Sequence, residues 1–395
     1  MMEVKSKYML KKIFENIRKK RKMKLIKYNK KIQKKLNVSI EDYKRHYYQI
    51  KIELKPRTYY DEANQFINCN DEDESYIHIY FNRDKREKKI FILDIGEKIE
   101  NIKIKIDYEF NSFKGLFKGC EDIEEIKFIK FNRTNIVDMS EMFSGCKYLR
   151  YLNFSKFKTD KVNNMSYMFS NCSSILYLNL KTFKTTNVEN MQHMFDGCTS
   201  IREFDLRRFD TSNVIYMNNM FSHCESLIFL RADISVFNTK NVINMSYMFS
   251  YCYSLRDVNV SNFVTTNVID ISFMFYNCGK LTELNLENFN TSNVMNMSNM
   301  FEGCRELIIL NLNISNFVIN NDTITKYMFY RCNDNLKEKI KKQIPKLNDT
   351  AFDYFDNKVD GNDGNDDDNN EDVNDEGDDD NANDDEDDYD KLEFV

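Results

Sequence analysis

Apolar residues recur in one fixed pattern through the middle of the chain. In the segment 157–180, Met165, Met168, Phe169 and Cys172 lie at positions i, i+3, i+4 and i+7. This spacing is typical of a short helix with one apolar face. The pattern IxxLxL follows, and its last two apolar residues alternate with polar ones as in a short strand. The segment therefore predicts one short helix followed by one short strand.

The residues that flank this helix fit its two ends. Asn164 directly precedes the apolar stripe and is a good N-cap, because its side chain can accept a hydrogen bond from a free backbone N–H. Asn171 stands where several other units carry glycine, a residue that suits the exit from a helix. Phe183 closes the turn that leads into the next unit.

The same unit returns every 26 residues, with two intervals of 28. A fixed period of this length is typical of a supersecondary unit that stacks on copies of itself. One unit buries too little apolar area to offset its loss of chain entropy, so neighbouring units must fold together. Nine cysteines mark the repeat: Cys120, Cys146, Cys172, Cys198, Cys224, Cys252, Cys278, Cys304 and Cys332.

Equivalent residues of successive units should form columns inside the stack. Valines and phenylalanines equivalent to Val162 and Phe157 are expected in the core. Threonines and asparagines are expected to form polar ladders that satisfy backbone N–H and C=O groups. The threonines are Thr159, Thr185, Thr211, Thr239, Thr265 and Thr291, and the asparagines are Asn187, Asn213, Asn241, Asn267 and Asn293.

The segments outside the repeats predict two caps and two charged ends. Short apolar bursts at 77–82, 89–95 and 101–106 predict strands. Such a strand-rich cap would cover the apolar end of the stack. In the closing helix, Leu336 and Ile340 should point inward, with Ile344 near its end. The predicted parts are a basic arm (1–36), an N-terminal cap (37–110), tandem repeats (111–334), a closing helix (335–348) and a disordered acidic tail (349–395).

Charge is concentrated at the two ends of the chain. The formal net charge is −6, yet residues 1–36 carry 15 Lys/Arg against 2 Glu, and residues 349–395 carry 22 Asp/Glu against 2 Lys. Three interpretations of the arm stay open: a solvated helix, a nucleic-acid or nuclear-import segment, and a helix on an anionic membrane surface. The candidate basic arm residues are Arg18, Lys19, Lys20, Arg21 and Lys22.

Several function classes find no support in the sequence. The four histidines are His46, His78, His193 and His223, and the last two replace ordinary polar residues at their repeat positions. No Gly-rich phosphate loop or nucleophile elbow is present. Each unit has one cysteine and no CxxC pair, so we expect no metal site. Because the motifs above are absent, we also expect no cofactor and no catalytic residues. Equivalent thiols on neighbouring helices would lie about 10 Å apart, beyond the Cα separation of about 7 Å that a disulfide tolerates.

The beginning of the chain contains no apolar run of signal-peptide length. No stretch approaches the roughly 20 apolar residues that cross a bilayer. We therefore expect an intracellular protein without a transmembrane segment. The cytoplasm is favoured, the nucleus is an alternative, and the cell surface is less favoured.

The pattern FxTxNVxNMSxMFxxCxxLxxLNL resembles the repeat of the BspA-like leucine-rich repeat family, which includes microbial surface proteins and mycoplasma-type repeat proteins of unknown function. The resemblance covers about residues 111–332. It implies a non-enzymatic parallel solenoid with a strand-lined face, often adhesive. The expected fold is thus an α/β repeat solenoid, leucine-rich-repeat-like, with short parallel strands and one short helix per unit.

The side chains beside the inward leucines should point outward on the strand-lined face and contact a protein partner. We therefore expect a non-catalytic protein interaction scaffold. A nuclear or nucleic-acid-associated factor that uses the basic arm is an alternative, and a cell-surface adhesin is a second. The candidate face residues are Tyr151, Asn153, Tyr177, Asn179, Glu203, Asp205, Phe229, Arg231, Asp257, Asn259, Glu283, Asn285, Ile309 and Asn311.

Overall fold

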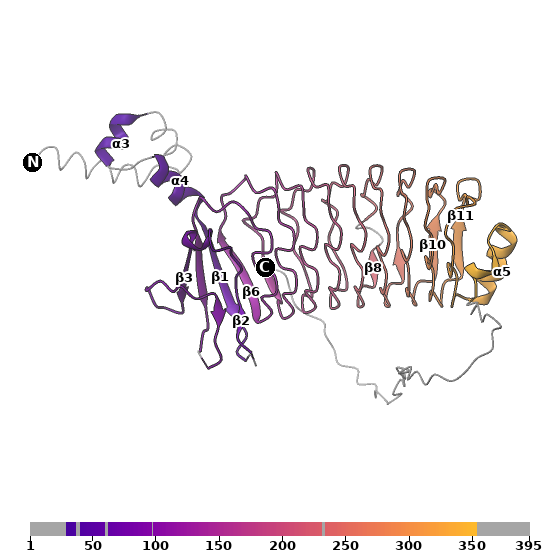
Figure 1. The fold of residues 1–395 in the computed structure, drawn as a ribbon, viewed down its shortest axis with the longest axis horizontal. Coiled ribbons are helices and arrows are strands. Elements are labelled where there is room, and N and C mark those ends of the chain that lie inside the picture. The colour runs from indigo at the N-terminus through magenta and orange to yellow at the C-terminus, as the bar shows by residue number, and fades with distance from the viewer. Residues whose placement is uncertain (1–28, 37–39, 60–61, 97, 231–233, 354–395) are drawn as a thin grey trace, which may run out of the picture. The chain divides into compact units, whose positions relative to one another are not determined.

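A computed structural model describes residues 29–36, 40–59, 62–96, 98–230 and 234–353 (Figure 1). The described chain is rich in strands and turns and has few helices. Its sheets are open rather than closed into barrels. Two groups of predicted functional residues lie outside the described ranges: the basic arm positions Arg18, Lys19, Lys20, Arg21 and Lys22, and the face residue Arg231.

Short helices and an antiparallel sheet come before the repeats. The strands of this sheet alternate buried and more exposed positions, so their isoleucines point into one core. The elements are α3 (Lys30–Leu36), α4 (Ile40–Tyr48), β1 (Ile50–Pro56), β2 (Asn64–Gln65), η1 (Glu74–Tyr76), β3 (Ile77–Phe81), β4 (Ile92–Leu93) and β5 (Ile102–Ile106). The predicted strands at 77–82 and 101–106 correspond to β3 and β5. The predicted strand at 89–95 is reduced to the two residues of β4.

Strand β6 (Ile123–Lys130) joins this sheet to the repeats. It pairs antiparallel with β1 on one side and parallel with β7 (Tyr151–Asn153) on the other. The sheet order is β3-β5-β1-β6-β7. One continuous sheet therefore changes from antiparallel to parallel pairing at β6, and the first repeat presents no open edge at this junction.

A buried arginine, Arg133, links the segments that meet at this junction by hydrogen bonds. Its side chain is fully buried, and its guanidinium donates to three backbone carbonyls, those of Tyr48, Phe110 and Asp107. Burial lowers the pKa of Arg133 to about 10, and the nearby Tyr108, Glu109 and Asp107 partly oppose this shift. The group thus stays charged at neutral pH and binds carbonyls from α4 and from the segment after β5.

In each repeat unit, the segment predicted to form a short helix is a chain of tight turns instead. The prediction of one helix per unit is therefore wrong. The N–H groups of Met168, Ser170 and Cys172 donate to carbonyls three residues back, whereas those of Tyr167, Phe169 and Asn171 donate to carbonyls of the next unit. An α-helix would need donation four residues back within the segment. Tyr167 and Asn171 have φ of 57° and 58°, in the left-handed region that ends each turn.

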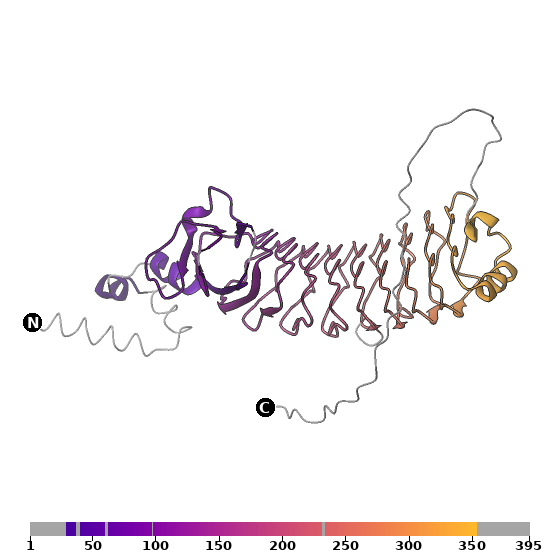
Figure 2. The same ribbon diagram turned by 90° about the horizontal axis from the view of Figure 1, so that it is seen from below.

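Asn164 begins this chain of turns rather than capping a helix. Its backbone forms parallel bridges with Asp138 and Asn190 of the adjacent units. Its side-chain oxygen accepts from the N–H of Ser166 at 3.0 Å, which shapes a local turn. Equivalent bridges run unit by unit from Asp138 to Ile324. The tandem units therefore pair with one another in parallel along this column (Figure 2).

On the opposite part of each unit, short strands form where the IxxLxL pattern predicts them, but not in every unit. They pair in parallel, with Leu284 beside Leu310. The segments at 177–180 and 203–206 are irregular. The strands are β7, β8 (Phe229–Leu230), β9 (Asp257–Val258), β10 (Glu283–Leu286) and β11 (Ile309–Leu312).

Apolar columns fill the space between the turns and the strands. One phenylalanine column stacks ring on ring, with neighbouring centroids 5.2–5.9 Å apart. It comprises Phe143, Phe169, Phe195, Phe221, Phe249, Phe275, Phe301 and Phe329, all fully buried. The inward positions predicted from Met165, Met168 and Cys172 are buried as well, even though no helix carries them.

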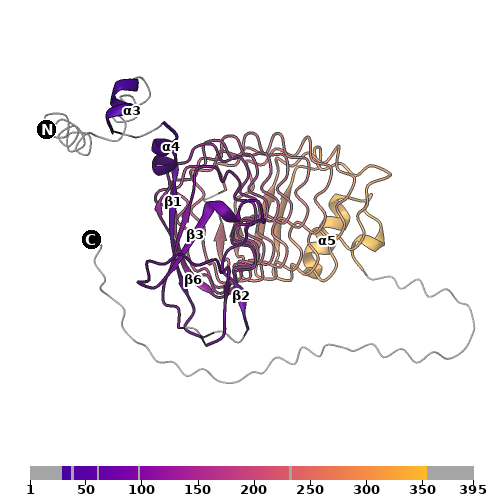
Figure 3. The same ribbon diagram turned by 60° about the vertical axis from the view of Figure 1, so that its left-hand side comes forward.

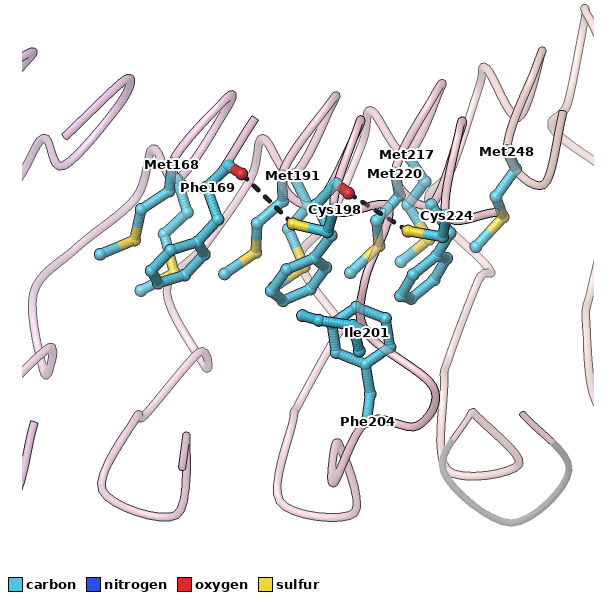
Figure 4. Close-up of a cluster of buried hydrophobic side chains, with 14 of the residues drawn as sticks. Met168, Phe169, Met191, Cys198, Ile201, Phe204, Met217, Met220, Cys224 and Met248 are labelled. Carbon is cyan, nitrogen blue, oxygen red and sulfur yellow. Dashed lines mark hydrogen bonds between the residues drawn. The ribbon is translucent and has the colours of Figure 1, made fainter. Parts of the chain in front are cut away.

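The repeat cysteines are buried, free thiols. Each from Cys146 to Cys332 donates its Sγ–H to the carbonyl of a phenylalanine in the preceding unit, at 2.9–3.3 Å. Figure 4 shows two of these bonds, from Cys198 to Phe169 and from Cys224 to the equivalent residue, Phe195. Burial raises the pKa of these thiols, for Cys332 to about 12. They are therefore poor nucleophiles.

The predicted polar ladders are confirmed. The hydroxyl of Thr265 donates to the carbonyl of Asn290 at 2.9 Å and accepts from the N–H of the same residue at 2.7 Å. The asparagine column works in the other direction, since Asn267 donates to the carbonyl of Lys240 in the preceding unit. The other threonines and asparagines of the two columns make equivalent bonds.

The last unit is closed by a helix and by one further piece of chain. Helix α5 (Asp334–Gln343) follows the last unit (Figure 3). Its N-cap is Asn333, and Leu336 and Ile340 are buried as predicted. The short helix η2 (Asp349–Ala351) follows, and the carbonyls of Thr350 and Ala351 accept the N–H groups of Tyr327 and Phe329. The prediction that the disordered tail begins at 349 is therefore corrected, because residues 349–352 provide the acceptors that another turn would provide.

The threonine ladder predicts a matched pair of stability effects. Thr265→Val keeps the side-chain shape but leaves the partly buried N–H and C=O of Asn290 without their partner. We expect a loss of about 1–3 kcal/mol in the free energy of unfolding, measured by urea denaturation. The control is Thr266→Val, because its exposed side chain makes no ladder bond, and this change should cost less than about 0.5 kcal/mol. Equal losses in the two variants would contradict a ladder role.

Arg133 gives a second stability prediction. Arg133→Met removes the donor to three backbone carbonyls in the buried junction, and we expect a loss of about 2–4 kcal/mol. Arg202→Met, at an exposed position, is the control. Thermal unfolding monitored by circular dichroism measures both. A neutral effect of Arg133→Met would show that the junction does not depend on this guanidinium.

Candidate functional site

The candidate face is formed by the outward side chains of β7 to β11 and of the segments between them. In β10, exposed Glu283 and Asn285 alternate with buried Leu284 and Leu286. Parallel pairing places residues of one unit beside their equivalents in the next, so Asn285 lies beside Asn311. The alternation that defines the strand therefore also arranges the candidate residues in outward columns.

The structure places the described candidate residues on this face with different degrees of exposure. Tyr151 is 67% exposed, Phe229 56% and Tyr177 52%. Ile309 is also exposed. The polar positions Asn153, Asn179, Glu203, Glu283, Asn285 and Asn311 are exposed, and Asp205, Asp257 and Asn259 are half-buried.

Several of the predicted polar contact residues serve the local fold. The side-chain oxygens of Asn153, Asn179 and Asn285 each accept the N–H of the residue two positions ahead, at 2.9–3.3 Å. This bond turns the chain where the strand ends. Asp205 accepts from Arg207, and its pKa is lowered chiefly by that hydrogen bond. These polar side chains are thus partly engaged in the local fold. The exposed aromatic side chains of Tyr151, Tyr177 and Phe229 are freer to contact a partner.

The exposed tyrosines surround a hollow of about 820 Å³ over the first units of the face. Tyr151 and Tyr177 line it together with Leu176, which is 69% exposed. Charged residues also line it: Glu125, Lys127, Arg150 and Lys181. Side chains from β6, β7 and the following unit therefore meet in one open depression with an apolar centre.

Three residues that line this hollow were not predicted from the sequence: Leu176, Arg150 and Lys127. Arg150 and Leu176 each stand one residue before a predicted face residue, Tyr151 or Tyr177. The equivalent residue in the last unit with a strand is Ile308. Lys127 lies on β6, which pairs with β7 beside Asn153. The available signal was that large apolar residues, Leu176, Ile228 and Ile308, alternate at this position with arginines and a threonine.

A second hollow, of about 480 Å³, lies over later units of the same face. Its lining is polar and acidic and includes Asp257, Asn259, Glu283, Asn285 and Asn311. The face therefore differs along its length, with aromatic and basic groups over the first units and carboxylates over the later ones.

His78, His193 and His223 are engaged in local contacts. His78 contacts Glu87 and Asp107, and His193 contacts Asp196 at 2.8 Å while its ring stacks on Tyr167. Within the described ranges, no group of three or more His, Cys, Asp or Glu side chains is placed to hold a metal ion. None of the helices in these ranges has the length and apolar character that crossing a bilayer requires.

Comparison with known proteins places the repeats in a family. None of the curated proteins compared matches the chain. One family profile matches twice in tandem, over residues 111–228 and 228–343, which together are more than half of the chain. The two matches cover the turns and strands described above and end with helix α5. The chain therefore belongs to the family described as Mycoplasma protein of unknown function, DUF285.

Proposed function

We propose that this chain is a non-catalytic scaffold that binds a protein partner through the strand-lined face of a leucine-rich-repeat-like solenoid. The parallel bridges from Asp138 to Ile324 support the solenoid, because each unit pairs with the next in the same direction. The inward leucines of the strands and their parallel pairing support the resemblance to BspA-like repeats.

The observation that carries the binding proposal is the group of large apolar side chains exposed around the first hollow. Tyr151, Leu176 and Tyr177 are each more than half exposed. Covering such side chains would contribute about 1.5–3 kcal/mol each in a well-packed contact. Because β7 pairs with β6, the backbone that carries Tyr151 is already held in place, so less conformational freedom is lost there on binding than in a loop.

The charged residues around the hollow suit the rim of a protein interface. Lys127 pairs with Glu125 at 2.6 Å, and both are partly exposed. Arg150 is exposed at the edge of the same hollow. Aromatic anchors at the centre with charges at the rim are the usual arrangement of a protein-binding surface. The roles predicted for the basic arm and for cell-surface adhesion stay predictions.

The proposal predicts loss of partner binding when the two tyrosines are removed. The immobilised full-length chain is incubated with extract of its source cells, and retained proteins are quantified by mass spectrometry. Tyr151→Ala combined with Tyr177→Ala should lower retention of the specific partner at least about tenfold, since two anchors each contribute more than about 1 kcal/mol. The purified partner should show the same loss in its Kd.

The control variant combines Tyr216→Ala with Tyr253→Ala, which removes two exposed tyrosines outside the candidate face. It should retain the partner as the unmodified chain does. Thermal unfolding of both variants checks that the fold is intact. If no protein is retained selectively, or if the face variant and the control retain it equally, binding through this face is wrong.

A further inference from the structure

The first hollow of the strand-lined face shares a wall with another hollow. This other one, the corner hollow, has a volume of about 510 Å³ and lies where the early units turn away from the face. Lys181 and Thr182 line both hollows. Each unit folds at this corner around a buried phenylalanine, and the rings of Phe157 and Phe183 stack with centroids 5.9 Å apart. A partner segment that leaves the first hollow at Lys181 therefore enters the corner hollow.

The charged lining of the two hollows is mostly basic. It contains six basic side chains and two carboxylates. Each carboxylate pairs with one lysine, Glu125 with Lys127 at 2.6 Å and Asp160 with Lys184 at 2.5 Å. The other four basic side chains are exposed, and among the described residues no carboxylate forms an ion pair with them. They are Arg150, Lys158, Lys181 and Arg208. Together they create a local positive potential that attracts carboxylates.

Two carboxylates beside the corner hollow respond to this potential. The pKa of Asp160 is lowered first by its hydrogen bond with Lys184 and further by the charge of Lys158. The pKa of Asp205 is lowered first by its hydrogen bond with Arg207 and further by the charge of Lys181. The surroundings thus favour the ionised form of a carboxyl group.

The fold of the corner does not require this charge. Arg208 donates to the carbonyl of Lys181 at 3.4 Å, and in a later unit the uncharged Asn262 makes the equivalent bond to Ser235 at 2.8 Å. The corners of the later units form without any Lys or Arg, and their equivalent positions carry Ser235, Val236, Asn238, Ser261, Asn262, Val264, Glu287, Asn288, Asn290, Ser315, Asn316 and Val318. The positive charge is therefore particular to the early units, where the exposed tyrosines of the face also lie.

We propose that the protein partner of this face is bound through an acidic segment. A large apolar side chain of that segment packs against Tyr177 and Leu176 in the first hollow, and neighbouring Asp or Glu residues pair with Lys158, Lys181 and Arg208. This inference rests on the proposed function and adds the chemistry of the partner. The charge of the segment is opposite to that of the four unpaired cations, and its apolar residue covers side chains that are more than half exposed.

The extent of the charge favours a polypeptide over a nucleic acid. Lys158, Lys181 and Arg208 belong to three successive units, and turns about 4.8 Å apart place them within roughly 10 Å along the stack. Three or four residues of an extended polypeptide, at about 3.3 Å each, cover this distance. A nucleic acid backbone needs a longer basic track, and on the face of the third unit it would meet the carboxylates of Glu203 and Asp205.

Selection from a library of random peptides displayed on phage tests the proposal with the full-length chain. The library is first depleted on immobilised chain that carries Lys158→Glu and Arg208→Glu. This step removes peptides that bind elsewhere, including those that bind the basic residues 1–36. The remaining peptides are selected on the unmodified chain and sequenced. We expect at least about a twofold excess of Asp and Glu over the starting library, close to a large apolar residue.

The Kd of a selected synthetic peptide then locates the contact. It should rise at least about fivefold when Lys158→Glu and Arg208→Glu are combined, and raising NaCl from about 0.05 to 0.5 M should weaken binding to the unmodified chain in the same direction. The matched control, Lys240→Glu with Lys339→Glu, makes the same change in net charge at exposed positions of a later unit and of α5 and should leave the Kd unchanged. If thermal unfolding shows that the charge-reversal variant is not folded, Lys158→Gln with Arg208→Gln takes its place in both steps.

Four results would overturn the proposal. They are the absence of an acidic excess among the selected peptides, a Kd that charge reversal leaves unchanged, an equal rise in the control variant, and a single-stranded oligonucleotide that displaces the peptide and binds more tightly.

The failure of the proposed function is distinguished by Tyr151→Ala combined with Tyr177→Ala. If this variant loses the partner captured from cell extract but charge reversal does not weaken that partner's binding, only the acidic character of the partner is wrong. If the tyrosine variant binds both the partner and the selected peptides as the unmodified chain does, binding through the face is wrong as well.

Discussion

The structure depends on backbone hydrogen bonds between consecutive units. In each chain of turns, alternate N–H groups have no acceptor within their own unit, and the carbonyls of the next unit accept them. Buried backbone groups without partners would cost about 1–3 kcal/mol each, so a single unit is incomplete until its neighbour is in place. The threonine hydroxyls add bonds to the next unit, and the asparagine amides and cysteine thiols add bonds to the preceding one. The cap at β6 and the carbonyls of residues 349–352 close the two ends of this series.

The sequence predicted which residues point inward better than it predicted the backbone that holds them. The spacing of Met165, Met168, Phe169 and Cys172 fits a helix, yet a chain of tight turns buries the same positions. What decides between them is the left-handed φ at Tyr167 and Asn171, which residue type alone does not indicate when the side chain is a tyrosine. The spacing of about 10 Å predicted between equivalent thiols is wrong, because the described units lack the predicted helices. Turns that lie about 4.8 Å apart are within reach of a disulfide, and each thiol donates to a phenylalanine carbonyl instead.

The candidate site was predicted more completely in its aromatic column than in its polar one. Alternation along a strand identified Tyr151, Tyr177 and Phe229 as outward, and all three are exposed. The asparagines of the neighbouring column look equally available in the sequence, yet several bond to the backbone two residues ahead. Leu176 was missed because only the positions that flank the inward leucines were considered. The hollow itself depends on how three segments meet around Lys127, and local patterns carry no information on that.

The uniform bonding between units has a consequence for how such a chain can change in length. The chains of turns use the same backbone donors and acceptors at each internal interface, and β6 on one side and the short helix η2 on the other are specialised. Duplication or deletion of whole internal units would therefore leave both ends matched to their neighbours. The outward residues at equivalent positions, in contrast, differ from unit to unit. Gene segments of this kind can gain or lose contact surface in steps of one unit, without any redesign of the core.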